Sequence, residues 1–207
     1  MAYANWLLPS KTSGSGNDTV DVTAVSNNTG RNSRQTQVTF KAANVADVVR
    51  TVIQAGKPEF VTIQSAAAVS KNGVTVLTIE GVSNSSKLTF ALASGGSLPL
   101  TLPATYLANS LQTNNGAAIA GDPGAGQEFP FSILFAIIPK NPVVTERTAQ
   151  LIVTDAAGHT ATCTITQAAG DATLEVSPQT VNLDWDAATQ GKTASFAVTS
   201  NTNWTVE

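Results

Sequence analysis

Apolar and polar residues alternate with a period of two along most of the chain. In the stretch DTVDVTAV, Val20 and Val22 face one way and Asp21 faces the other, as in a β-strand with one buried face. Similar short runs, rich in β-branched residues and bounded by Gly, Asn, Pro or Ser, recur along the sequence: TQVTF, VRTVIQ, FVTIQ, VTVLTIEGV, KLTFALA, AQLIVT, TATCTITQ, TLEVSP and ASFAVTS. Their spacing of about 8–12 residues predicts an all-β sandwich fold.

One region departs from this pattern, between Thr105 and Phe131. It predicts a short helical turn near Leu107–Leu111, followed by a long glycine-rich loop. The glycines of 121–127 do not form a phosphate-binding loop, because no lysine follows them and no helix start is evident. We expect this loop to be flexible and to be a contact site for another protein.

An internal repeat divides the chain. Arg34 precedes Gln54 by 20 residues, and Arg147 precedes Gln167 by 20 residues, so the period is 167 − 54 = 113. That period is close to the length of one immunoglobulin-like sandwich. Both copies read as the closing hairpin of such a domain.

The repeat predicts three parts. Residues 57–170 hold both the opening and the closing strands of an immunoglobulin-like sandwich. Residues 1–56 hold only later strands of a domain, and residues 171–207 hold only early ones.

Composition limits the function classes. Apolar residues make up 42% of the chain, which is enough for real cores, whereas charged residues make up 12% and the net charge is −3. No basic surface is predicted, so we expect no nucleic-acid partner. No apolar run is long enough to span a membrane, and the first residues lack the basic and apolar regions of a secretion signal.

Catalytic and metal-binding chemistry is not evident. His159 is the only histidine and lies in the predicted turn DAAGHTA, while the lone Cys163 alternates with threonines and is predicted to be a small core residue. Catalysis or metal binding needs partners at bonding distance, and the sequence has no Cys/His cluster. We therefore expect no cofactor, no metal and no enzyme activity.

Two acidic residues flank a tryptophan in LDWDA. Asp184 and Asp186 would face the same side of a strand, at a spacing that could suit a glycosidase pair or a calcium site. No calcium loop follows, and no deep cleft is implied. A solvated acidic pair that protects a strand edge is the favoured interpretation.

Both ends of the chain resemble BACON domains, which are immunoglobulin-like modules of Bacteroidetes surface proteins and of the crAss-like phages that infect them. The C-terminal part resembles the first half of such a domain, through Ser200, Asn201 and Trp204. The N-terminal part resembles the second half. Its matching features are Trp6, the SGSG of 13–16, Asn27 and Asn28 with Arg34, and the closing Gln54-Ala55-Gly56.

A half-sandwich exposes apolar faces and unpaired edges, so a partner is required. Residues 1–56 and 171–207 should lie at opposite ends of a sandwich about 35–40 Å long, which argues against closure within one chain. Head-to-tail complementation between copies is the favoured hypothesis; a chain that continues past Glu207 and closure within one chain are the alternatives. The residues predicted to pack at the joint are Trp6, Leu7, Val176, Val181, Trp185, Phe196, Val198 and Trp204.

These observations favour a structural protein, and the resemblance implies a virion surface, as a phage capsid auxiliary or decoration subunit that also contacts other virion proteins. The alternative is a carbohydrate-binding or spacer module of a Bacteroidetes cell-surface protein, located at the cell surface or in the periplasm. Exposed aromatic rings can stack on sugars, and Trp6, Trp185, Trp204 and Tyr106 are the candidates for such a platform. Core packing is the favoured role for Trp6 and Trp204.

Overall fold

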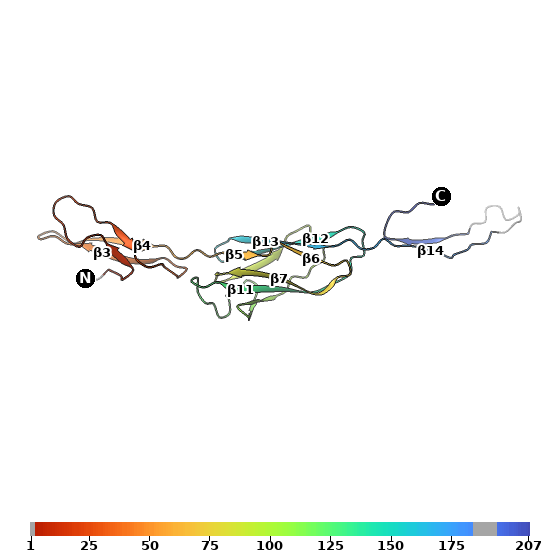
Figure 1. Ribbon diagram of the computed structural model, residues 1–207, viewed down its shortest axis with the longest axis horizontal. Coiled ribbons are helices and arrows are strands. Elements are labelled where there is room, and N and C mark those ends of the chain that lie inside the picture. The colour runs from red at the N-terminus through yellow and green to blue at the C-terminus, as the bar shows by residue number, and fades with distance from the viewer. Residues whose placement is uncertain (1–2, 184–193) are drawn as a thin grey trace.

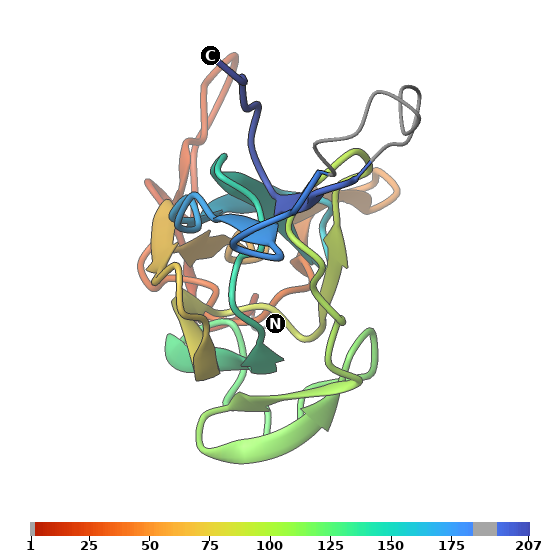
Figure 2. The ribbon, with the colours of Figure 1, turned by 90° about the vertical axis from the view of Figure 1, so that its right-hand side faces the viewer.

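The computed structural model describes residues 3–183 and 194–207. These residues form strands, turns and loops and contain no helix, so no helix among them could span a membrane. Three parts follow one another along the long axis (Figure 1): an N-terminal segment of residues 3–56, a central sandwich, and a hairpin near the C-terminus. Figure 2 looks along that axis from the C-terminal end, with the hairpin nearest the viewer.

Nine strands form the central sandwich. Its first sheet has the order β10-β9-β11-β7-β5, and its second has the order β6-β13-β12-β8. The strands of the first sheet are β5 (Val61–Ile63), β7 (Val74–Ser83), β9 (Thr105–Ala108), β10 (Leu111–Asn114) and β11 (Phe129–Ile138). The strands of the second are β6 (Ala66–Val69), β8 (Leu88–Leu92), β12 (Arg147–Asp155) and β13 (Thr160–Gln167).

The pairing confirms the predicted immunoglobulin-like sandwich. All pairs are antiparallel except that of β6 with β13. Inward-facing side chains alternate with outward-facing ones, as in β12, where Leu151 and Val153 are fully buried. They meet Ile79, Ile133 and Phe135 of the facing sheet in one apolar core. Burial of these side chains stabilises the sandwich by roughly 1.5–3 kcal/mol each.

The predicted helical turn near Leu107–Leu111 is wrong. Strands β9 and β10 form a tight hairpin there, with Ala108 opposite Leu111. The two turn residues, Asn109 and Ser110, have φ angles of 49° and 65°. Two consecutive left-handed residues match the twist of the flanking strands in a two-residue hairpin turn, and they cannot continue a right-handed helix.

The N-terminal segment contains two small sheets. One pairs β1 (Leu7–Pro9) with β2 (Val22–Ala24), and the other pairs β3 (Arg34–Phe40) with β4 (Val48–Gln54).

The closing hairpins of this segment and of the central sandwich share one register. Arg34 lies opposite Gln54 as Arg147 lies opposite Gln167, a displacement of 113 positions on both strands. The sequence repeat is therefore confirmed: β3 and β4 are the counterparts of β12 and β13.

A third unit follows the sandwich. Strand β14 (Leu174–Ser177) pairs antiparallel with β15 (Ala197–Ser200) in a two-stranded sheet. Figure 1 shows this hairpin extending away from the end of the sandwich opposite to β3 and β4. The two end units are therefore separated by the whole central sandwich.

Candidate functional site

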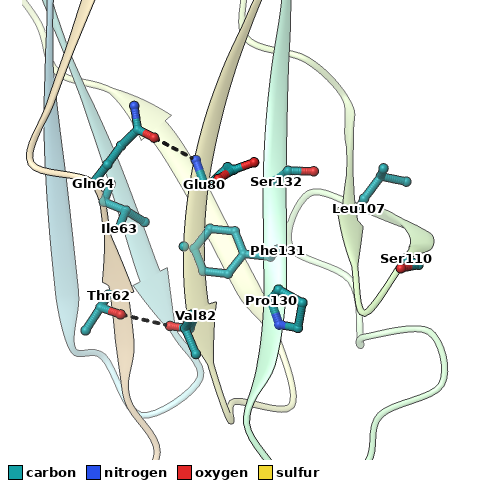
Figure 3. A pocket seen from close by; sticks show the side chains of 11 residues that line it. Thr62, Ile63, Gln64, Glu80, Val82, Leu107, Ser110, Pro130, Phe131 and Ser132 are labelled. Atoms are coloured by element: carbon teal, nitrogen blue, oxygen red, sulfur yellow. Dashed lines mark hydrogen bonds between the residues drawn. The ribbon is translucent and has the colours of Figure 1, made fainter.

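A groove of about 520 Å³ crosses the outer face of the five-stranded sheet. Figure 3 shows Glu80 as its one carboxylate, beside Ser132 and Gln64. The ring of Phe131 reaches across to Gly81, where a side chain would collide with it. General acid–base chemistry needs a second titratable partner within reach, and the lining residues include none. The groove therefore offers no catalytic arrangement.

His159 and Cys163 lie where the sequence predicted. His159 follows the turn between β12 and β13 with an exposed ring, and its Nδ1 lies 2.8 Å from Oδ2 of the buried Asp155. Cys163 is fully buried in the core, and this burial raises the pKa of its thiol. The described residues contain no group of three or more His, Cys, Asp or Glu side chains placed to hold a metal ion.

The aromatic candidates for a sugar platform have different environments. Trp6 is buried within its own chain, with the guanidinium carbon of Arg34 4.8 Å from its ring centroid. Tyr106 is buried too, so its ring offers no exposed face for a sugar, and burial raises its pKa to about 12. Trp204 is 48% exposed. Trp185, with the acidic pair beside it, lies outside the described residues.

One turn occurs in both the N-terminal segment and the central sandwich. In each, an asparagine amide donates to two carbonyl oxygens, one four residues later and one just after the last strand. The donor–acceptor pairs are Asn28 to Asn32 (2.8 Å) and Ala55 (3.2 Å), and Asn141 to Thr145 (2.8 Å) and Ala168 (2.9 Å). All members are displaced by 113 positions, so the match extends beyond the hairpin.

The same displacement holds for the glutamine that ends each closing strand. Gln54 Nε2 donates to Ser26 O at 3.0 Å, and Gln167 Nε2 donates to Pro139 O at 2.8 Å. Ser26 follows β2 and Pro139 follows β11, again 113 positions apart. Strand β2 is therefore the counterpart of β11.

A second turn occurs in both the central sandwich and the C-terminal hairpin. The side chain of Asn84 accepts from Phe60 N at 2.8 Å, and that of Asn201 accepts from Thr173 N at 2.8 Å. The preceding serines donate to the same two residues: Ser83 Oγ to Phe60 O (2.6 Å) and Ser200 Oγ to Thr173 O (2.8 Å).

The strand pairings of β5 with β7 and of β14 with β15 show the same correspondence. Val61 lies opposite Ser83 as Leu174 lies opposite Ser200. Strands β14 and β15 are therefore the counterparts of β5 and β7, at displacements of 113 and 117 positions. The hairpin carries the two opening strands of a sandwich, and the N-terminal segment carries the strands that such a hairpin would cover.

The matching positions differ in burial. Phe196 is 48% exposed, whereas its counterpart Ile79 is fully buried. Val22 is 42% exposed, whereas its counterpart Phe135 is 1% exposed. The inward-facing side chains of both end units are thus open to solvent in a single chain.

A hollow marks the open face of the N-terminal segment. It has a volume of about 650 Å³, and Val20, Val38 and Phe40 are among its lining residues. The counterparts of Val20 and Val38 are Ile133 and Leu151, which are fully buried in the central sandwich. Both of those positions belong to the apolar core of the sandwich, where Ile133 pairs with Ile79 of β7. Among the described residues of the N-terminal segment no strand takes the place of β7.

The other residues predicted at a joint lie as follows. Leu7 is buried in its own chain, and Val176 is 48% exposed. Val181 and Val198 are half-buried. Contact of any of these residues with a neighbouring subunit stays a prediction.

The burial difference predicts unequal costs of truncation in a dilute, single-chain sample. Phe135→Ala should lower the free energy of unfolding of the sandwich by about 3–5 kcal/mol, because it leaves a cavity in a filled core. Val22→Ala should lower the free energy of unfolding of the N-terminal segment by less than about 1 kcal/mol, because the side chain is already 42% exposed. Denaturant titration of both variants measures the difference, and similar large losses would contradict the open face.

Arg31 joins the N-terminal segment to the sandwich, which the sequence did not predict. Its guanidinium donates two hydrogen bonds to Asp122, at 2.7 and 2.8 Å, and one to Asn84 O at 2.8 Å. Nε lies 2.6 Å from Oε1 of Glu59 in an ion pair. Asp122 belongs to the glycine-rich loop, so this loop contacts a segment of its own chain; its contact with another protein stays a prediction.

This junction should weaken in acid. The hydrogen bonds from Arg31 hold the pKa of Asp122 below its ordinary value of 3.8. A lowered folded-state pKa stabilises the junction above that ordinary value, and the contribution is lost as the pH falls through the folded-state pKa. The amide of Gly124, which donates to Asp122 at 2.9 Å, should shift in NMR spectra with a midpoint below 3.8. A midpoint above 3.8, or the same titration in Asp122→Asn, would contradict this.

Comparison with known families agrees with the N-terminal resemblance. The family model described as "BACON: Putative binding domain, N-terminal" matches residues 1–55, which confirms that this segment resembles a BACON domain; that it corresponds to the second half stays a prediction. The match does not include the C-terminal hairpin, whose resemblance stays a prediction. A search of curated proteins finds no match.

Proposed function

We propose that the chain is a non-enzymatic structural protein whose copies join head to tail by strand complementation. The C-terminal hairpin of one copy would complete the N-terminal segment of the next. One observation carries the proposal: the two ends match different strands of the central sandwich, and each shares one hydrogen-bonded turn with it. The open faces support it, since an exposed apolar strand face favours burial against another chain.

Such a contact is heterologous, because two different surfaces of the same chain meet. Repetition of a heterologous contact generates rings when the rotation closes and filaments when it does not. A virion surface, where the subunit would act as a capsid auxiliary or decoration protein beside other virion proteins, is the setting we propose.

A carbohydrate-binding or spacer module of a bacterial cell surface is the second candidate. The description of the matched family as a binding domain favours it. In this role the sandwiches would hold a binding surface at a distance from the cell, and the half-exposed Trp204 is the described aromatic residue best placed to stack on a sugar.

Two measurements separate the candidates. Sedimentation velocity over a concentration series should show species that grow from the monomer by whole chains. A chain that stays monomeric at every concentration would reject head-to-tail assembly. Affinity electrophoresis in polysaccharide gels tests the second candidate, and retardation abolished by Trp204→Ala would support it.

A further inference from the structure

Resting on the proposed head-to-tail assembly, we propose the strand edge and the register at which two copies meet. Strand β15 of one copy pairs antiparallel with residues 16–19 of another, along the free edge of the segment that continues into β2. Phe196 then lies opposite Val20, and Ala197 lies opposite Thr19. The partner is thus a second copy of this chain, recognised by main-chain pairing and by an apolar face.

The register follows from the counterparts in the central sandwich. There, β7 pairs antiparallel with β11, with Ile79 opposite Ile133 and Glu80 opposite Ser132. Strand β15 is displaced by 117 positions from β7, as Ser200 is from Ser83. The N-terminal segment is displaced by 113 positions from the sandwich. Applying both displacements gives the two pairs stated above.

The edge that receives β15 is unoccupied among the described residues. Strand β2 pairs with β1 alone. On the edge that faces β1, Asp21 O accepts from Ser10 N and Val25 N donates to Trp6 O, at 2.8 Å each. Backbone groups alternate between the two edges of a strand. Those of Val20 and Val22 therefore point to the opposite, unpaired edge.

That unpaired edge corresponds to the edge that β7 occupies in the sandwich. On the edge of β11 that faces β9, Pro130 O accepts a hydrogen bond from the backbone N–H of Asn109, the residue after β9. The counterparts of Asp21 and Val25 are Leu134 and Ile138. They lie four and eight residues after Pro130, so their backbone groups point to the same edge of β11 as the carbonyl group of Pro130. Strand β1 therefore lies on the β9 side, and the β7 side remains open.

Strand length gives independent support. Strand β11 spans ten residues between two partners, whereas β2 spans three beside one. The counterpart of β11 would run from Gly16 to Val25, and only Val22–Ala24 is a strand in the single chain. The register places residues 16–19 opposite β15 and Val20 opposite Phe196, so pairing should extend β2 toward Gly16.

Apolar surface on both sides fits the same register. Phe196 and Val22 are both about half-exposed, and Val20, the proposed partner of Phe196, lines the hollow together with Phe40. The hairpin of the same chain lies beyond the far end of the central sandwich (Figure 1). A second copy is the occupant that can bring β15 to this edge without dismantling the sandwich.

Disulfide trapping tests the register in the full-length chain. Ala197 and Thr19 would form a non-hydrogen-bonded pair, with Cα atoms about 4.5 Å apart, within the span of a disulfide. Thr19→Cys and Ala197→Cys, made in separate chains and mixed under mild oxidation, should give a disulfide-linked dimer of the two variants. The side chain of Cys163 is buried and should remain reduced.

A register control uses Asp21→Cys in place of Thr19→Cys. Diagonal neighbours lie about 7–8 Å apart, so this mixture should cross-link at least about tenfold more slowly. Equal or faster cross-linking of Asp21→Cys would overturn the register while leaving head-to-tail assembly intact.

The doubly substituted chain, Thr19→Cys with Ala197→Cys, separates the remaining outcomes. It should give a ladder of linked chains in a non-reducing gel. A cross-linked monomer of altered mobility would show closure within one chain and overturn the proposal. Sedimentation of the reduced variants identifies the other failure: absence of any self-association rejects the proposed function itself, whereas association without cross-linking rejects this edge.

Discussion

Replacing Phe196 by aspartate is expected to weaken self-association of the chain by at least about 100-fold. Its counterpart Ile79 is fully buried in the central sandwich, so assembly should bury Phe196 in the same way. Burial of a large apolar side chain stabilises by roughly 1.5–3 kcal/mol, and an unpaired carboxylate at such a position costs several kcal/mol more. Each 1.4 kcal/mol is a factor of about ten in affinity.

The chain offers a matched control one residue away. Ala197 faces the other side of β15, and its counterpart in β7 is Glu80. Ala197→Glu should therefore leave the association constant within about threefold of the parent value. Sedimentation velocity of both variants measures the contrast. Equal losses would show a general effect of charge, and an undiminished Phe196→Asp variant would remove this face from the joint.

Deleting residues 171–207 is expected to abolish assembly and to leave the central sandwich folded. The apolar core runs from Val61 to Ile165 and includes no residue of the hairpin. The hairpin contacts the sandwich through Asn201 Nδ2, which donates to Pro142 O at 3.0 Å, and through an exposed ion pair between Lys71 and Asp171. Exposed ion pairs contribute only about 0–1 kcal/mol.

Two readouts are needed for the deletion. Denaturant unfolding should give a midpoint for the sandwich within the error of the parent chain, and sedimentation should give a monomer at all concentrations. A truncated chain that assembles as the parent does would exclude the hairpin from the joint. A truncated chain that no longer unfolds cooperatively would show that the hairpin belongs to the core of the sandwich.

Much of the fold was predictable because alternation with a period of two is read directly from β-branched residues. The two closing hairpins were predictable in register as well. Arg and Gln at their ends repeat at one displacement, and no insertion interrupts the interval between Ser26 and Gln54 or its counterpart. Burial of Cys163 followed from the same alternation, and exposure of His159 followed from its place in the turn DAAGHTA.

Other features were not predictable for physical reasons. The hairpin at Asn109-Ser110 depends on two left-handed residues without the glycine that usually signals them. Strand β11 contains a proline and a nearly continuous apolar run, which hides its period. The shared turn of Asn84 and Asn201 does not show as a repeat in the sequence, because the hairpin strands are separated by four more residues than β5 and β7. Arg31 gave no signal, since Asp122 lies 91 residues away.

Mixing two full-length variants tests the central claim most directly. Phe196→Asp disables the hairpin face and leaves the N-terminal face intact, whereas Val22→Asp disables the N-terminal face and leaves the hairpin intact. Each variant alone should be a monomer of 21.3 kDa, because each lacks one of the two surfaces.

An equimolar mixture should form a dimer of one chain of each kind, 2 × 21.3 = 42.6 kDa, and nothing larger. Mass photometry or light scattering after size-exclusion chromatography would detect it. A mixture that remains monomeric, or variants that each assemble alone as the parent does, would contradict head-to-tail completion of one sandwich by two copies.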